Sequence, residues 1–153
     1  ISFISYFEDS YLLFTVPRFS YSLKKQSINP KKIYSIDNGL SYVNSASFSE
    51  DKGKMLENMF FLNLRKNYKE IFYFHKKNEC DFVVKKGTKI KEAVQVCYEI
   101  NEENKDREIN GLSEAMDEFN LEEGLILTFN QEDEIKIKNK KITIKPMWKL
   151  VDF

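Results

Sequence analysis

The chain of 153 residues has the length and composition of one globular domain, with 42% hydrophobic and 14% aromatic residues. This composition excludes a disordered chain, because disordered chains are poor in aromatic residues. Basic and acidic residues both number 24, so any polyanion has to be bound by a local patch. No segment has the apolar length of a membrane span and no signal peptide is visible, so we expect a cytoplasmic domain without a membrane partner.

Residues 1–49 are expected to form a small N-terminal section that contains a helix end and a hairpin. The chain opens on Ile1 within what resembles the tail of a helix, so we expect a piece of a longer protein. An apolar run at 12–16 is closed by Pro17, and alternating aromatic and polar residues then predict a strand. The expected helix end, first strand, polar turn and second strand lie at 1–11, 18–23, 24–32 and 32–36.

Residues 50–153 are expected to form the main domain, a mixed sheet flanked by two helices. Apolar residues at helical spacing predict helices at 50–67 and 105–120. Their buried stripes are expected to be Met55, Leu56, Met59, Phe60 and Leu64, and Ile109, Leu112, Ala115, Met116 and Phe119. The predicted strands lie at 71–75, 79–85, 90–100, 124–128, 134–138 and 141–145. A strand–helix–strand crossover would place 124–128 parallel to 94–98.

The predicted hairpin of 79–85 and 90–100 carries the most informative polar residues. Simple alternation puts Glu79, Asp81 and Val83 on one face of the sheet. A register that pairs Asp81 with Gln95 leaves a three-residue loop at 87–89 and places the apolar rows of both strands on the same side. Asp81 and Gln95 are then expected to be neighbours on the more polar face.

A carboxylate on the first helix is the natural partner of this pair. Glu57 lies at the edge of the apolar stripe, where an unpaired charge would be costly. Oxygen ligands from Glu57, Asp81 and Gln95 suit a hard cation such as Mg²⁺, which activates water and stabilises phosphoryl transfer. The alternative is an exposed helix residue or a simple ion pair at Glu57, with a structural hydrogen bond at Gln95.

The order helix-Glu, strand-Asp, strand-Gln resembles the PD-(D/E)XK nuclease superfamily. The motifs KKIYSIDNGL, KMLENMFFLNLR, NECDFVV, AVQVCYEI, DREINGL and EEGLILT resemble the C-terminal domain of unknown function in a family of prokaryotic AAA-type P-loop ATPases. The resemblance covers residues 6–153 and implies a restriction-endonuclease-like fold and an ATPase module in the parent chain. The sequence has no GxxxxGK[ST] motif, so ATP would bind only in that other module.

The resemblance also implies roles for individual residues. Glu57, Asp81 and Gln95 match the catalytic and metal-binding positions, and Glu79 matches a supporting position. Cys97 stands where an active nuclease has a lysine, and a cysteine supplies no fixed positive charge for the developing phosphate charge. Lys91 and Arg107 are the nearest residues in the sequence that would replace that lysine, and the Arg107–Glu108 pair matches a further family position.

The remaining candidates have structural interpretations. His75 has no nucleophile at a suggestive spacing and is expected at the surface, whereas Cys80 and Cys97 are expected as small buried thiols. We expect Trp148 and the Phe and Tyr residues in the core, with an aromatic stacking platform as the alternative. The lysine clusters at 24–32, 85–91 and 136–145 fit solvated loops, or contacts with a nucleic-acid backbone.

Three functions follow from these patterns. The first is a nuclease-derived domain that binds DNA or another nucleic acid without cutting it. The second is an active magnesium-dependent DNA phosphodiesterase. The third is a protein-interaction domain that couples the ATPase module to a partner. The Cys97 substitution favours the first and third, and the fold by itself selects none of them.

Overall fold

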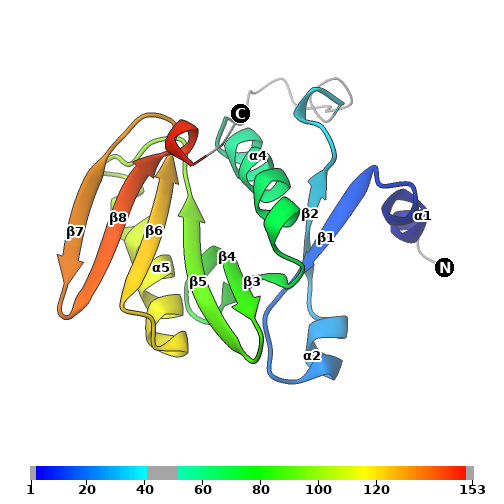
Figure 1. Cartoon of the computed structure of the whole chain (residues 1–153), viewed down its shortest axis with the longest axis horizontal. Helices are drawn as coiled ribbons and strands as arrows, with labels where there is room; N and C mark the ends of the chain where they lie inside the picture. Colours follow the sequence, from blue (N-terminus) through cyan, green and yellow to red (C-terminus); the bar gives the residue numbers. More distant parts are fainter. Residues whose placement is uncertain (1–2, 41–51, 151–153) are drawn as a thin grey trace.

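The computed structural model describes residues 3–40 and 52–150 (Figure 1). Its helices are α1 (Phe3–Asp9), α2 (Leu23–Ile28), α4 (Lys52–Asn67), α5 (Lys105–Phe119) and the short 3₁₀ helix η1 (Met147–Lys149). Its strands are β1 (Leu13–Pro17), β2 (Lys31–Ser35), β3 (Ile71–His75), β4 (Glu79–Lys86), β5 (Lys89–Val96), β6 (Glu123–Thr128), β7 (Asp133–Ile137) and β8 (Lys140–Pro146). The predicted boundary at 49/50 lies outside the described residues.

A six-stranded mixed sheet in the order β3-β4-β5-β6-β8-β7 forms the centre of the molecule (Figure 1). β6 is parallel to β5 and to β8, and the other pairs are antiparallel. Val94 pairs with Leu125, as the predicted crossover requires. An α/β fold with a mixed central sheet flanked by helices is therefore confirmed.

The two faces of the sheet are covered by different elements. On one face, α4 and the β1–β2 hairpin contribute Leu56, Phe61 and Tyr34 to a core cluster that includes Phe82 of β4. On the other face, α5 packs through Leu112 and neighbouring side chains against the opposite surface of the same strands (Figure 1). Because both faces are buried, the central strands are nearly continuous in apolar residues.

The buried helix stripes agree with the predicted ones in α5 and differ in α4. Leu112, Ala115 and Met116 are fully buried, as predicted. In α4, Leu56, Phe60 and Leu64 are buried as predicted, but Met55 and Met59 are exposed and Phe61 is buried in addition. The stripe is rotated because Phe61 stacks on Tyr34, with ring centroids 4.4 Å apart, which turns this side of the helix toward the β1–β2 hairpin.

The N-terminal hairpin contradicts two predictions. Its first strand is the apolar run of β1, which pairs with β2 through Thr15↔Ile33, and not the alternating segment 18–23. The predicted polar turn contains helix α2, which starts because the Ser22 side chain accepts a hydrogen bond from the Lys25 backbone N–H. Trp148, expected in the core, is 58% exposed in η1.

Two β-bulges modify the predicted pairing of β4. One lies between Val84 and Lys85 and shortens the predicted three-residue loop to a two-residue turn between Lys86 and Lys89. The other lies where β4 passes β3, between the pairs Phe72↔Val83 and Phe74↔Cys80.

No helix in the described part of the chain is long and apolar enough to cross a membrane.

Candidate functional site

The bulge opposite β3 determines where Asp81 points. Between the two flanking pairs, Tyr73 of β3 faces both Asp81 and Phe82 of β4, so the alternation of side chains reverses at this point. Cys80 and Val83 consequently lie in the cluster beneath α5, while Phe82 lies beneath α4. The predicted alternation, with Asp81 on the same face as Val83, was therefore wrong. Asp81 is directed to the α4 side together with Phe82.

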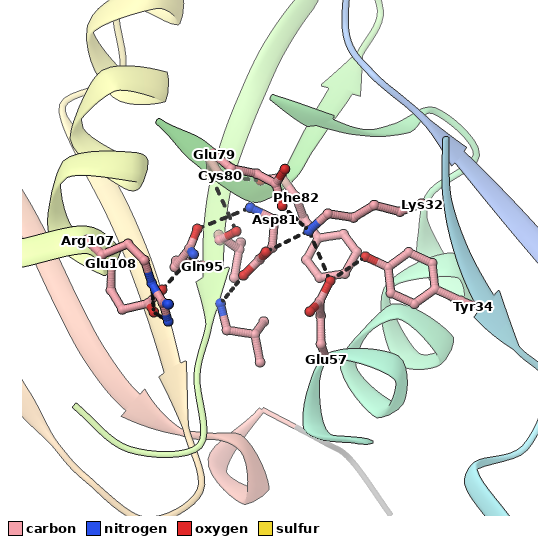
Figure 2. A network of polar contacts seen from close by, with 12 residues as sticks. Lys32, Tyr34, Glu57, Glu79, Cys80, Asp81, Phe82, Gln95, Arg107 and Glu108 are labelled. Atoms are coloured by element: carbon pink, nitrogen blue, oxygen red, sulfur yellow. Dashed lines mark hydrogen bonds and ion pairs between the residues drawn. The ribbon is translucent and has the colours of Figure 1, made fainter. Parts of the chain in front are cut away.

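On that side, three carboxylates surround one ammonium group (Figure 2). Lys32 Nζ of β2 lies 2.7 Å from Asp81 Oδ1, 2.9 Å from Glu79 Oε1 and 3.1 Å from Glu57 Oε1. Glu57 reaches the cluster from α4, and Glu79 and Asp81 reach it from β4. The structure thus brings the predicted Glu57, Glu79 and Asp81 together, around a lysine that the sequence analysis had placed where a polar turn meets the second strand.

The surroundings fix each carboxylate of this acid cluster in place. The Tyr34 hydroxyl donates to Glu57 Oε1 at 2.6 Å, and the Val96 backbone N–H donates to Asp81 Oδ2 at 2.9 Å. Burial, followed by the negative charge of Glu57, raises the pKa of Tyr34, so its hydroxyl remains a donor. β2 therefore supplies both the cation and the hydrogen-bond donor that hold Glu57 toward the sheet.

Negative charge is in excess at this site. With all groups ionised, three carboxylates face one ammonium. Burial and the nearby charge of Glu57 raise the pKa of Asp81 to about 7, against the opposing effect of Lys32. For Lys32, burial alone would lower the pKa, but the charges of Asp81 and Glu57 outweigh burial and raise it. Lys32 is therefore charged throughout the physiological range, whereas Asp81 titrates within it.

Gln95 lies beside the acid cluster and is directed to the other face of the sheet (Figure 2). Its side-chain oxygen accepts a hydrogen bond from the Asp81 backbone N–H at 3.1 Å, and its amide nitrogen donates to Glu108 Oε2 at 2.7 Å. Glu108 in turn binds the Arg107 guanidinium, with Nε to Oε1 at 3.0 Å. Gln95 thus connects β4 to α5, and its expected role as the third ligand stays a prediction.

A close approach of α5 to β4 makes this connection possible. A Cβ atom at Gly111 would lie 2.0 Å from the backbone oxygen of Glu79 and 3.8 Å from the side-chain oxygen of Gln95. Only glycine permits the helix to lie this close to the strand. Gly111, in the DREINGL motif, therefore brings Glu108 within reach of Gln95.

The acid cluster opens into a cavity of about 810 Å³ that also exposes basic side chains. Lys52, Lys54, Lys77 and Arg107 line it together with Glu57, Glu79 and Asp81. The Arg107 side chain is 76% exposed although its partner Glu108 is buried, so its guanidinium is held at the edge of the cavity. Lys91 is exposed and does not line this cavity, so it does not replace the missing lysine.

Cys97 lies in the cavity wall as a buried thiol. Burial, with the charge of Glu108 as the next cause, raises its pKa to about 12. Cys80 is also a buried free thiol, as predicted. Neither thiol supplies charge at neutral pH, so the only described ammonium in contact with Asp81 is that of Lys32.

One signal in the sequence, combined with the structure, identifies Lys32 and Tyr34 in retrospect. In an extended Lys32-Ile33-Tyr34 segment, the first and third side chains share one face. Tyr34 is buried against α4, so Lys32 is directed toward the same helix. The prediction failed because residues 24–32 were assigned to one solvated lysine-rich turn, although β2 begins at Lys31.

The donor set of the acid cluster matches magnesium in its chemistry. Carboxylate oxygens are the ligands that Mg²⁺ prefers, and the cluster has negative charge in excess of its single ammonium. As the side chains now lie, Lys32 occupies the point on which the acids converge. Within residues 3–40 and 52–150, no three acidic, thiol or imidazole side chains form a group that could hold a metal ion. Glu57 and Asp81 are the residues that would hold one.

Comparison with known proteins finds a relative in the archaeon Methanocaldococcus jannaschii. The chain is 39% identical over 159 residues to an uncharacterized protein of this organism, with 97% of the chain covered. It spans about a third (35%) of the length of that relative. No family model matches the chain, and no solved structure matches it.

Proposed function

We propose that this domain is a magnesium-dependent nuclease module in which Lys32 supplies the positive charge that Cys97 lacks. The observation that carries the proposal is the position of Lys32 Nζ, within 3.1 Å of Asp81, Glu79 and Glu57, in a cavity lined by further basic groups. Acids that bind a metal ion and an adjacent fixed ammonium are the two elements required to stabilise phosphoryl transfer. The resemblance to PD-(D/E)XK nucleases supports the same chemistry.

Each residue has a defined task in this proposal. Glu57 and Asp81 would hold magnesium, which would lower the pKa of a water ligand and neutralise charge on the phosphate. Lys32 contacts a non-bridging phosphate oxygen, where charge develops during the reaction. Tyr34 and the Val96 N–H orient the two carboxylates. Arg107, held by Glu108, binds a neighbouring phosphate of the same strand.

The domain is proposed to act within a longer protein that carries an AAA-type P-loop ATPase module. The motif resemblance supports this arrangement, as does the share of the archaeal relative that the chain spans. In that protein ATP would bind to the other module, because the present sequence has no phosphate-binding loop of that type.

The test is cleavage of labelled single- and double-stranded DNA and RNA by the purified chain with Mg²⁺ or Mn²⁺. We expect the wild type to cut, and Asp81→Asn and Lys32→Met each to lower the rate at least about a hundredfold. Lys136→Met is the matched control, because the Lys136 side chain is 77% exposed on β7 and its Nζ lies 3.9 Å from Glu134 Oε1. Cutting that persists in Asp81→Asn, or no cutting by the wild type, would contradict the proposal.

A protein-interaction role is the second candidate, because the N-terminal section exposes large apolar side chains. Helix α1 buries none of its residues, and Phe3, Tyr6 and Phe7 are 82%, 59% and 45% exposed. Exposed apolar patches of this kind mark interfaces. Size-exclusion chromatography with light scattering tests the simplest form of this role, and a monomer unchanged by Phe3→Ser and Phe7→Ser would exclude self-association through α1.

A further inference from the structure

Two aromatic side chains form a stacked pair beside the cavity. Tyr98, two residues after β5 ends, lines the cavity, and its ring stacks on Phe129 with centroids 5.0 Å apart and an interplanar angle of 16°. Phe129 is 50% exposed. A single exposed phenylalanine is unremarkable, but here the half-exposed ring stacks on a tyrosine that lines a charged cavity.

Several hydrogen bonds hold the loop that carries Phe129. The Phe129 backbone N–H donates to the Tyr98 backbone oxygen at 2.9 Å. The Gln131 side chain accepts from the Ile100 N–H at 2.5 Å and donates to the Ile100 oxygen at 3.0 Å, and its N–H donates to Thr128 Oγ1. The stacked pair is therefore preorganised, so binding a planar ligand costs little ordering of the protein.

Positive charge lies next to the rings. Lys52 Nζ, in the first turn of α4, is 5.5 Å from the centroid of the Tyr98 ring, and the Lys52 side chain also lines the cavity. Arg107 lies in the wall of the same cavity. Aromatic faces for bases next to cations for phosphates are the combination by which proteins bind single-stranded nucleic acid.

We infer that Tyr98 and Phe129 form a base-stacking platform and that the substrate of the site is single-stranded nucleic acid. Tyr98 lies two residues, about 7 Å of extended chain, beyond Val96, whose N–H holds Asp81. A base on the platform would thus belong to a nucleotide adjacent to the phosphate at the acid cluster. Because a base has to leave a duplex to stack on a protein ring, the platform selects unpaired strands. This inference rests on the proposed nuclease function for the identity of its ligand.

The experiment measures binding without cleavage, in EDTA, so that its result is independent of activity. The probes are a 12-nucleotide single strand that contains 2-aminopurine and the corresponding blunt duplex, followed by anisotropy and by 2-aminopurine fluorescence. We expect the single strand to bind at least about tenfold more tightly than the duplex, with a change in fluorescence on stacking. Phe129→Ala should weaken single-strand binding about tenfold.

Trp148→Ala, which removes an exposed aromatic side chain outside the platform, is the control and should bind as the wild type does. Weaker single-strand binding by Phe129→Ala than by the wild type supports the platform even when the wild type does not cleave. Absence of cleavage by the wild type would refute only the nuclease activity. Equal affinity for both probes, or a Phe129→Ala variant with unchanged affinity and fluorescence, overturns the platform even when the wild type does cleave.

Discussion

Removing the Lys32 ammonium should destabilise the fold in a way that depends on pH. Lys32→Met keeps most of the side-chain volume but leaves Asp81, Glu57 and Glu79 close together without a cation between them. Lys32 opposes the rise in the pKa of Asp81, so without Lys32 ionisation of the Asp81 carboxyl at alkaline pH costs more free energy than in the wild type. At pH 5 Asp81 is already protonated in the wild type, because burial and Glu57 raise its pKa to about 7. Replacement of Lys32 therefore lowers the free energy of unfolding less at pH 5 than at alkaline pH.

The solvent exposure of Lys32 and its carboxylate partners sets the size of this destabilisation. Removal of one partner from a fully buried ion pair costs about 3–5 kcal/mol. The side chains of Lys32, Glu57 and Asp81 are 20%, 19% and 8% exposed, and that of Glu79 is 44% exposed, so solvent screens part of the interaction. We expect Lys32→Met to lower the free energy of unfolding by about 2–3 kcal/mol at pH 8 and by about 1 kcal/mol at pH 5.

Urea denaturation at both pH values, monitored by circular dichroism, measures these free energies. Lys136→Met serves as the control and should remain within about 0.5 kcal/mol of the wild type. In a double-mutant cycle at pH 8, Lys32→Met combined with Asp81→Asn should cost at least about 1 kcal/mol less than the sum of the two single changes. A Lys32→Met cost below about 0.5 kcal/mol at pH 8, or equal costs at both pH values, would refute the reasoning.

Three further predictions follow from the same contacts. The folded pKa of Asp81, about 7, exceeds its reference value of 3.8, so the contribution of Asp81 to stability is complete below pH 4 and is lost as pH rises through 7. Urea titrations should therefore show the stability of the wild type, relative to Asp81→Asn, falling by up to about 4 kcal/mol over this range. Gly111→Ala places a Cβ 2.0 Å from the Glu79 oxygen and should lower the thermal midpoint by at least about 4 °C, whereas Asn110→Ala, exposed on the same helix, should not. Both cysteine thiols are buried with raised pKa values, so neither should react with Ellman's reagent at pH 7.5 until urea unfolds the chain, and fast reaction in the native state would contradict their burial.

Most of the fold was accessible from the sequence because its main elements have strong periodic patterns. The α5 stripe and the parallel placement of β6 were both predicted, since Leu112, Ala115 and Met116 recur at helical spacing and one crossover geometry dominates. The N-terminal hairpin was not, because a polar segment such as 24–32 carries too little hydrophobic pattern to distinguish a capped helix from a turn. Ser22, which caps α2, was the local signal that the composition of the segment concealed.

The candidate site was predicted in part, and the errors at Asp81 and Gln95 have one physical origin. The sequence places Glu57 and Asp81 correctly, but alternation along β4 holds only until the chain reaches the bulge. One extra residue opposite Tyr73 reverses the direction of every side chain that precedes it. The Asp81 carboxylate is thereby directed away from the Gln95 side chain and toward Lys32. No local pattern in NECDFVV indicates this outcome.

The bulge also explains how this site can lack a lysine at position 97 and still contain one. Cys97 and Gln95 belong to the face of the sheet beneath α5, and burial there favours a neutral thiol. Asp81 opens to the α4 face, where β2 is the neighbouring element, so a lysine on β2 reaches the carboxylates directly. A nuclease-type site requires a positive charge at a point in space and not at a position in the sequence. For this reason, Cys97→Lys should not rescue a Lys32→Met variant in the cleavage assay, because residue 97 lines the same cavity but packs in the cluster beneath α5, whereas Lys32 reaches Asp81 from β2. Recovery of cutting would show that an ammonium at position 97 also reaches the carboxylates.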